Sequence, residues 1–414
     1  MTSVRTRPAM IGRFYGVDVS RDGEVRLRLL DDAIGEVEVI DGCLVGDEVR
    51  VSTRAVLVEV TADGSLRGRE TEPIETHHGT LCFDPSDGGI RPRENRRACG
   101  AFNRIVSEAN YFGMVNAFVH TRRAAITLNS LLSDVGCSKL PRLEVVTGAH
   151  SGSNLPGYAC GDGDRRAREL RPLSGGHYRL STRTSGVPEP LPVSPAGEVH
   201  LGPSRYRKPF AGSAAYLRNA AHNPAIVYHE FGHHLCRHTA DFRLNAERAG
   251  DKQRNGKTGI EEGVSDYFAA ALLGSGRPYG WYRADRGRRR DPELHRHASF
   301  PDDGGDAHGI GAIWASAWWR CRLDVVAAGL LRSEAAHDRV MMQSLVAVGE
   351  VGRGGKRSTR ARRESTRSSA ETMRAAYLWA LRSEAGAGAA DLGASIFAAY
   401  GLGEDLDVDT ATKC

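Results

Sequence analysis

The stretch Asn223–Leu235, with the sequence NPAIVYHEFGHHL, decides how the rest of this chain is interpreted. A capping Asn followed by Pro at the first helical position is a typical helix start, and the apolar residues that follow predict a buried helix. His229 and His233 are four residues apart, so their imidazoles project from one side of that helix and can bind one metal ion. Glu230 points off that axis, where a carboxylate can take a proton from a water that a zinc ion has acidified. The stretch therefore predicts the metal-binding helix of a zinc peptidase.

A second, mostly apolar helical stretch lies at residues 259–270 and has the sequence GIEEGVSDYFAA. A catalytic zinc needs three protein ligands and an open position, and Glu262 is the candidate third ligand. Asp266, one turn further on, is placed to accept the outer N–H of a ligating imidazole. Glu261 lies about 100 degrees round the helix from Glu262, and we expect it to be solvated or salt-bridged.

A third element, residues 302–319, is a Gly-rich turn that leads into an apolar helix (DDGGDAHGIGAIWASAWW). Peptide hydrolysis develops negative charge on the carbonyl oxygen, and His308 at the end of the turn is a candidate donor to that oxygen. Asp303, five residues earlier, is the candidate group that keeps His308 protonated. The alternative is that His308 only caps the helix.

Together the three elements resemble the gluzincin metallopeptidases of the thermolysin and fungalysin type. The family's two metal-binding histidines fall on His229 and His233, its general base on Glu230 and its third metal ligand on Glu262. The family's aspartate one turn after that ligand falls on Asp266, its catalytic histidine on His308, and the aspartate that supports this histidine on Asp303. The likeness covers roughly residues 100 to 403. The resemblance implies a thermolysin-like catalytic domain whose α/β lobe carries the first helix, a Zn2+ cofactor, a peptide or protein substrate, and secretion.

The chain pattern predicts an α+β protein in several parts. Apolar and polar residues alternate over the first part of the chain between Asp-Gly turns, which is typical of antiparallel strands, and the last part has helical periods. The expected parts are a small antiparallel β domain (1–73), a linker (74–98), a catalytic N-lobe with the zinc-binding helices (99–275), and a helical C-terminal lobe (276–414) with a basic insertion near 353–368.

Two segments of these parts carry further expectations. The N-terminal β domain has three open roles, which are to position substrate, to inhibit, or only to stabilise the catalytic domain, and we expect the last. Residues 197–202 predict a strand just before the metal-binding helix. The family resemblance implies that this strand forms an edge of the substrate cleft, where an extended peptide could add by backbone hydrogen bonds.

Composition limits the possible partners and location. A net charge of +5 over 414 residues is modest, so we expect no nucleic-acid partner, and the arginines at 286–290 and in the basic insertion are expected in solvated loops. No run of about eighteen apolar residues predicts a membrane span, and residues 1–14 lack the apolar core of a signal peptide. The sequence thus favours a cytoplasmic monomer, where the resemblance implies a secreted one. The eight cysteines form no CxxC pair and are expected to be reduced.

The sequence therefore predicts a zinc-dependent metallopeptidase, and an endopeptidase in particular. The alternative from another class is a catalytically silent, zinc-stabilised protein-binding module. A structural zinc site usually has a fourth protein ligand and no use for an acid beside the first histidine, so Glu230 favours the enzyme. A third reading is an aminopeptidase, for which Glu261 is the candidate carboxylate to hold a free amino terminus.

Overall fold

The computed structural model describes residues 10–53, 56–60, 66–70, 74, 79–85, 99–148, 150–151, 171–172, 175–179, 196–202, 219–240, 242, 256–282, 287, 289–293, 307–353 and 369–403. The chain divides into two compact units. The first comprises Met1–Asp18, Leu27–Arg123 and Pro141–Glu230, and the second comprises Val19–Arg26, Ala124–Leu140 and Phe231–Cys414. Helices and strands together confirm the α+β class.

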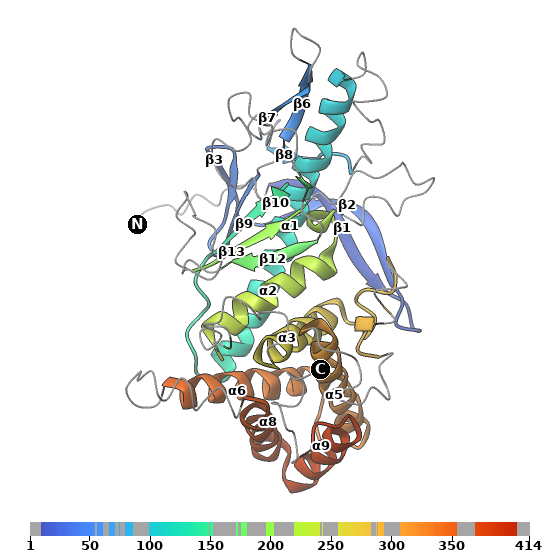
Figure 1. The fold of residues 1–414 in the computed structure, drawn as a ribbon, viewed down its shortest axis with the longest axis vertical. Coiled ribbons are helices and arrows are strands. Elements are labelled where there is room, and N and C mark those ends of the chain that lie inside the picture. Colours follow the sequence, from blue (N-terminus) through green and yellow to red (C-terminus); the bar gives the residue numbers. More distant parts are fainter. Residues whose placement is uncertain are drawn as a thin grey trace, which may run out of the picture. The chain divides into compact units, whose positions relative to one another are not determined.

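The largest sheet of the first unit has six strands in the order β12-β13-β9-β5-β4-β3 (Figure 1). The strands are β3 (Glu38–Ile40), β4 (Cys43–Val45), β5 (Val49–Thr53), β9 (Leu143–Thr147), β12 (Gly176–Arg179) and β13 (Glu198–Leu201). The central strands β5, β9 and β13 run parallel, whereas β12 lies antiparallel to β13 at the sheet edge. The apolar sequence of β9, LEVVT, suits a strand covered on both faces.

The remaining strands form smaller sheets. One has the order β2-β1-β8, and the pairs β6-β7 and β10-β11 make two-stranded sheets. Their bounds are β1 (Ile11–Val19), β2 (Val25–Ala33), β6 (Val56–Val60), β7 (Leu66–Glu70), β8 (Thr80–Leu81), β10 (His150–Ser151) and β11 (Arg171–Pro172). Gly23 and Gly42, in two of the predicted Asp-Gly turns, have φ values of 76° and 70°, which favour glycine. The Asp-Gly pairs therefore predicted these two turns correctly.

The expected separate β domain at residues 1–73 differs from the structure. Strand β5 pairs in parallel with β9, in the register Val49↔Leu143 to Thr53↔Thr147, so the N-terminal strands continue into the same sheet as β13. The expected linker supplies β8, which pairs in parallel with β1. The expected cleft-edge strand is present as β13, but among the described residues the outermost strand on that side of the sheet is β12. Pairing between strands ninety residues apart is absent from local patterns, because it is decided by which apolar faces meet.

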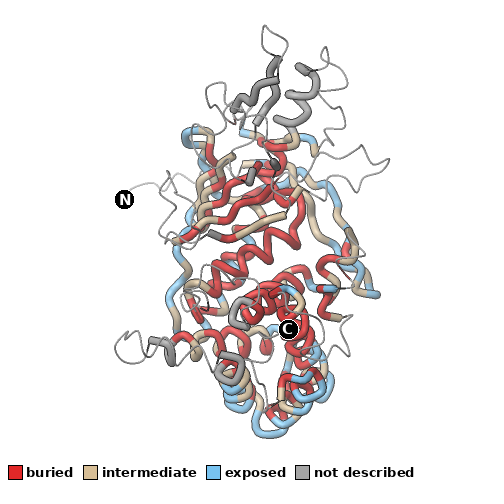
Figure 2. The backbone as a smooth tube through the Cα atoms, viewed as in Figure 1, coloured by how far each residue is buried: buried red, intermediate tan, exposed pale blue. Residues whose placement is uncertain are grey.

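Helices make up most of the second unit, and α1 and α2 each continue across the division between the units. The helices are α1 (Cys99–Asp134), the short 3-10 helix η4 (Ala220–His222), α2 (Pro224–His238), α3 (Gly256–Leu273), α5 (Ala307–Ala327), α6 (Glu334–Arg353), α8 (Ser369–Ala385) and α9 (Ala387–Ala399). Helices α2 and α3 are buried along most of their described length (Figure 2). No helix among the described residues combines the length and apolar character needed to cross a bilayer. Residues 354–368, most of the expected basic insertion, lie outside the described residues.

Helix α3 packs closely against α5 because glycines line the contact. A Cβ atom at Gly263 would lie 2.8 Å from the carbonyl oxygen of Gly311, and one at Gly311 would lie 2.7 Å from Cβ of Glu262. Side chains of that size would push the helix backbones apart. The close approach holds Glu262 against the first turns of α5.

A buried hydrogen-bonded chain joins α3 to α6 and α8. The Tyr267 hydroxyl donates to Oδ1 of Asp338 at 2.6 Å and lies 2.8 Å from Nδ1 of His337, while Nε2 of His337 lies 2.6 Å from the Tyr377 hydroxyl. Because Tyr267 donates to a carboxylate that Arg322 also binds, Nδ1 of His337 carries the proton and Nε2 accepts from Tyr377. Burial lowers the pKa of His337 to about 3.

We expect this burial to make stability depend on pH. His337 stays neutral in the folded protein down to about pH 3, whereas in the unfolded chain it titrates near 6.5. A depressed folded-state pKa contributes stability that is present above the unfolded pKa and is lost as pH falls, here by up to about 1.4 kcal/mol per pH unit. Buried His120 and His222, with pKa values lowered to about 3 and about 4, act in the same direction.

Urea unfolding at neutral pH and at about pH 5 measures this effect. The variant His337→Gln should start less stable than wild type, yet lose less stability between the two pH values. An equal loss in both proteins would contradict the assignment of His337 as a neutral buried histidine.

Candidate metal centre

Local sequence signals place the first two candidate ligands on α2. The Asn223 side chain accepts a hydrogen bond from the Ala225 amide at 3.0 Å, and the Asn223 carbonyl accepts the first intrahelical bond from Val227. Pro224 is the first helical residue, as the sequence predicted. A Cβ atom at Gly232 would lie 2.6 Å from Cα of Ser265, so α2 and α3 approach backbone to backbone at this point. That approach brings α3 to the histidines of α2.

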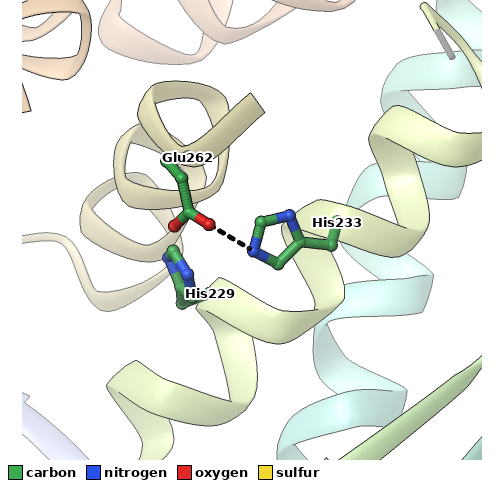
Figure 3. Close-up of side chains that lie close together, drawn as sticks. All are labelled: His229, His233 and Glu262. Carbon is green, nitrogen blue, oxygen red and sulfur yellow. Dashed lines mark ion pairs between the residues drawn. The ribbon is translucent and has the colours of Figure 1, made fainter. Parts of the chain in front are cut away.

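His229, His233 and Glu262 come together as one buried group (Figure 3). One ligating atom from each lies within 4.8 Å of the other two, and Nε2 of His233 is 3.6 Å from Oε1 of Glu262. Two atoms bound about 2.1 Å from a tetrahedral ion are roughly 3.4 Å apart, so this spacing suits an ion between them. The group can hold a metal ion, and its two nitrogens and one oxygen are donors that zinc accepts.

Glu230 stands beside this group on α2 and is 4% exposed. Among the described residues, its Oε2 atom is buried and has no hydrogen-bond partner. A buried carboxylate oxygen is costly without a partner, so this atom is suited to accept a hydrogen bond from a bound water or ligand. The donor set and this oxygen together fit a metal ion with an open coordination position.

Gly176 of β12 lies directly against Glu230. A Cβ atom there would be 2.6 Å from Cγ and 2.8 Å from Oε1 of Glu230. The edge strand of the six-stranded sheet therefore passes the side chain expected to act as general base. Sequence reasoning missed Gly176, because a glycine in a Gly-rich stretch gives no sign of what packs on it.

Glu261 is bonded to the candidate metal ligand His233. Its Oε1 atom accepts from Nδ1 of His233 at 2.8 Å, and both side chains are buried. With Nδ1 donating, Nε2 of His233 keeps its lone pair directed at Glu262 and at a metal. Of the two outcomes expected for Glu261, the solvated one is wrong because the side chain is 2% exposed, whereas the pairing with His233 corresponds to the salt-bridged one. The expected angle between Glu261 and Glu262 around the helix was correct. The sequence does not show, however, that α2 lies on the side to which Glu261 points.

Replacing Glu261 by Gln should weaken zinc binding about tenfold, because the amide keeps a hydrogen-bond acceptor but loses the charge that makes His233 a stronger ligand. Competition with a chromophoric chelator measures the zinc dissociation constant. The matched variant Glu334→Gln, at a half-exposed carboxylate on α6, should leave that constant unchanged. Equal zinc affinity in wild type and Glu261→Gln would contradict the supporting role.

Asp266 and Arg290 form a buried ion pair next to Glu262. Nε and Nη2 of Arg290 donate to Asp266 at 3.0 and 2.6 Å, and the Tyr279 hydroxyl also donates to Asp266. Nη2 of Arg290 is 3.5 Å from Oε2 of Glu262. Burial alone would lower the pKa of Arg290, but the charges of Asp266 and Glu262 raise it above its ordinary value. We expected Arg290 in a solvated loop, and it is instead the buried cation of the site.

The expected catalytic histidine lies at the edge of the site. His308 is in the first turn of α5, its side chain is 51% exposed, and its Nε2 atom is 3.6 Å from Oε2 of Glu262. His308 is therefore both close to the candidate ligands and accessible to solvent. Asp303, its expected supporting carboxylate, lies outside the described residues.

No family model matches this chain, and no curated protein matches it. The case for a function therefore depends on the residues of the site. The resemblance to gluzincin metallopeptidases stays a prediction from three motifs.

Proposed function

We propose that this protein is a zinc-dependent metallopeptidase that cleaves peptide bonds within extended chains. The observation that carries the proposal is the buried His229, His233 and Glu262 group with Glu230 beside it. A structural zinc site is usually closed by a fourth protein ligand, whereas the group found among the described residues has three members. The Glu230 oxygen next to it has no hydrogen-bond partner in the described part of the chain, which suits a carboxylate that must accept a proton.

The residues divide the chemistry among them. A zinc ion held by the three ligands would lower the pKa of a water molecule and polarise the peptide carbonyl. Glu230 takes a proton from the attacking water and passes it to the leaving amine. His308 donates a hydrogen bond to the developing oxyanion.

A carboxylate outside the ligand group keeps one histidine in a single tautomer. Glu261 does so for His233. The acceptor role expected for Asp266 stays a prediction, whereas Asp266 accepts hydrogen bonds from Arg290 and the Tyr279 hydroxyl. Since Glu261 is occupied by His233, it is poorly suited to hold a free amino terminus. This favours an endopeptidase over an aminopeptidase.

The edge strand β12 supports an extended substrate. An extended peptide can add to the outer strand of a sheet, and β12 is the outermost strand among the described residues and lies beside Glu230. A peptide that adds to β12 would bring its own backbone near the general base. Such binding depends little on side chains, so we expect broad sequence preference with unfolded proteins as the best substrates.

The test is zinc content and hydrolysis of an unfolded casein-like substrate by the purified full chain. We expect about one zinc per chain, cleavage at internal bonds, loss of cleavage with a chelator, and recovery when zinc is returned. A protein that holds zinc and cleaves no unfolded substrate would be a zinc-stabilised binding module instead.

A further inference from the structure

The tip of the N-terminal hairpin, residues 19–26, groups with the second unit, although the rest of β1 and β2 groups with the first. Two short-range backbone hydrogen bonds define its turn. The Ser20 amide donates to the Glu24 carbonyl at 2.9 Å, and the Gly23 amide donates to the Ser20 carbonyl at 3.0 Å. Gly23 has a φ of 76°, which a residue with a Cβ atom adopts only with strain.

The tip contacts the segment that follows α3. The hydroxyl of Ser275 donates to the Gly23 carbonyl at 2.5 Å, and a Cβ atom on Gly23 would lie 3.7 Å from Oε2 of Glu293. Ser275 and Val25 are both buried. A hairpin turn 252 residues away in sequence thus lies against both the start and the end of this segment.

The same segment carries side chains of the metal centre. Its two ends are joined by the Glu293 amide, which donates to the Gly276 carbonyl at 3.0 Å, and by Arg277, which binds the Glu293 carboxylate. Asp291 accepts from the amides of Tyr279 at 2.7 Å and Gly280 at 2.9 Å. These bonds fix the backbone on either side of the two residues that bind Asp266.

Those two residues are Tyr279 and Arg290. Both donate to Asp266, and Arg290 also lies 3.5 Å from the candidate ligand Glu262. Cζ of Arg290 lies over the Tyr279 ring, 4.9 Å from its centroid, so the two side chains that bind Asp266 also contact each other. A shift of the segment therefore changes the hydrogen bonds around Glu262 and its charge environment.

We propose that the hairpin tip is a positioning element of the metal centre, which acts through Ser275 and the segment up to Glu293 on Arg290, Tyr279 and hence Glu262. The inference builds on the proposed metal site. It assigns to the N-terminal hairpin an activating role, in place of the inhibitory or purely stabilising roles that the sequence left open. The turn and loop residues 275–282 need such bonds to hold a ligand's partners within a narrow range of positions.

The experiment compares Gly23→Ala and Ser275→Ala with two matched controls in the full-length protein. Gly42→Ala places the same strain in the turn between β3 and β4, and Ser344→Ala removes a buried hydroxyl from α6. The measurements are the zinc dissociation constant, the visible spectrum of the cobalt-substituted protein, and kcat and KM determined separately. Ser275→Thr, which restores a hydroxyl, serves as the rescue variant.

We expect both tip variants to weaken zinc binding by about fivefold to tenfold, to shift the cobalt spectrum, and to lower kcat with little change in KM. The controls and Ser275→Thr should stay near wild type. The inference is overturned if the tip variants lower only the melting temperature, or if they raise activity as loss of an inhibitory segment would. The zinc and cobalt measurements need no substrate, so a protein that cleaves nothing would end the peptidase proposal while still testing the hairpin.

Discussion

Glu230→Gln is expected to keep zinc at the wild-type content and to lower kcat for an unfolded casein-like substrate by about 10³-fold. Glutamine has nearly the same shape and stays next to the ligand group, but its amide cannot take a proton at neutral pH. Because Glu230 is buried with one oxygen unpartnered among the described residues, an amide fits there without breaking an existing bond to that oxygen. Metal analysis and steady-state kinetics on the same preparation measure both quantities.

The comparison variant is Glu262→Gln, which changes a candidate ligand in place of the base. We expect it to lose zinc, because a neutral amide is a far weaker zinc ligand than a carboxylate. The two variants should therefore differ in zinc content: Glu230→Gln keeps zinc and loses activity, whereas Glu262→Gln loses both. A Glu230→Gln protein that cleaves at the wild-type rate would show that another group takes the proton.

The parts of the site that the sequence predicted are those fixed within one segment. The cap at Asn223, the proline at the helix start and the four-residue spacing of His229 and His233 are all local, and the structure bears out the helix that they predict. Local signals are reliable here because helix caps and side-chain periods act over a few residues.

The parts that the sequence missed depend on which neighbour a face meets. Glu261 and Glu262 are adjacent acids on one helix, and only the close contact of α2 with α3 at Gly232 decides that the first binds His233. In the sequence Arg290 is one of several neighbouring arginines, and only its bond to the buried carboxylate of Asp266 distinguishes it. The parallel pairing of β5 with β9 is of the same kind. Long-range packing selects among options that local chemistry leaves equal.

Gly176→Ala is expected to lower kcat by about 10²-fold while zinc affinity and stability change little. The new methyl group would lie 2.8 Å from Oε1 and 2.6 Å from Cγ of Glu230, closer than carbon and oxygen atoms normally approach. The contact involves Cγ as well as the carboxylate, so the whole Glu230 side chain has to turn away from β12, and the carboxylate moves with it. A general base displaced by about 1 Å loses much of its effect, because proton transfer requires hydrogen-bond distance.

The matched control is Gly16→Ala, another glycine in a strand, where the new Cβ would lie 2.4 Å from the end of the Leu30 side chain and outside the site. Kinetics, zinc titration and thermal unfolding of both variants distinguish a local effect on Glu230 from general strain. If Gly176→Ala loses rate and Gly16→Ala does not, the edge strand β12 sets the position of the base as well as offering a surface to substrate. If Gly176→Ala keeps full activity, the Glu230 carboxylate works from more than one position, and its contact with β12 has no bearing on the chemistry.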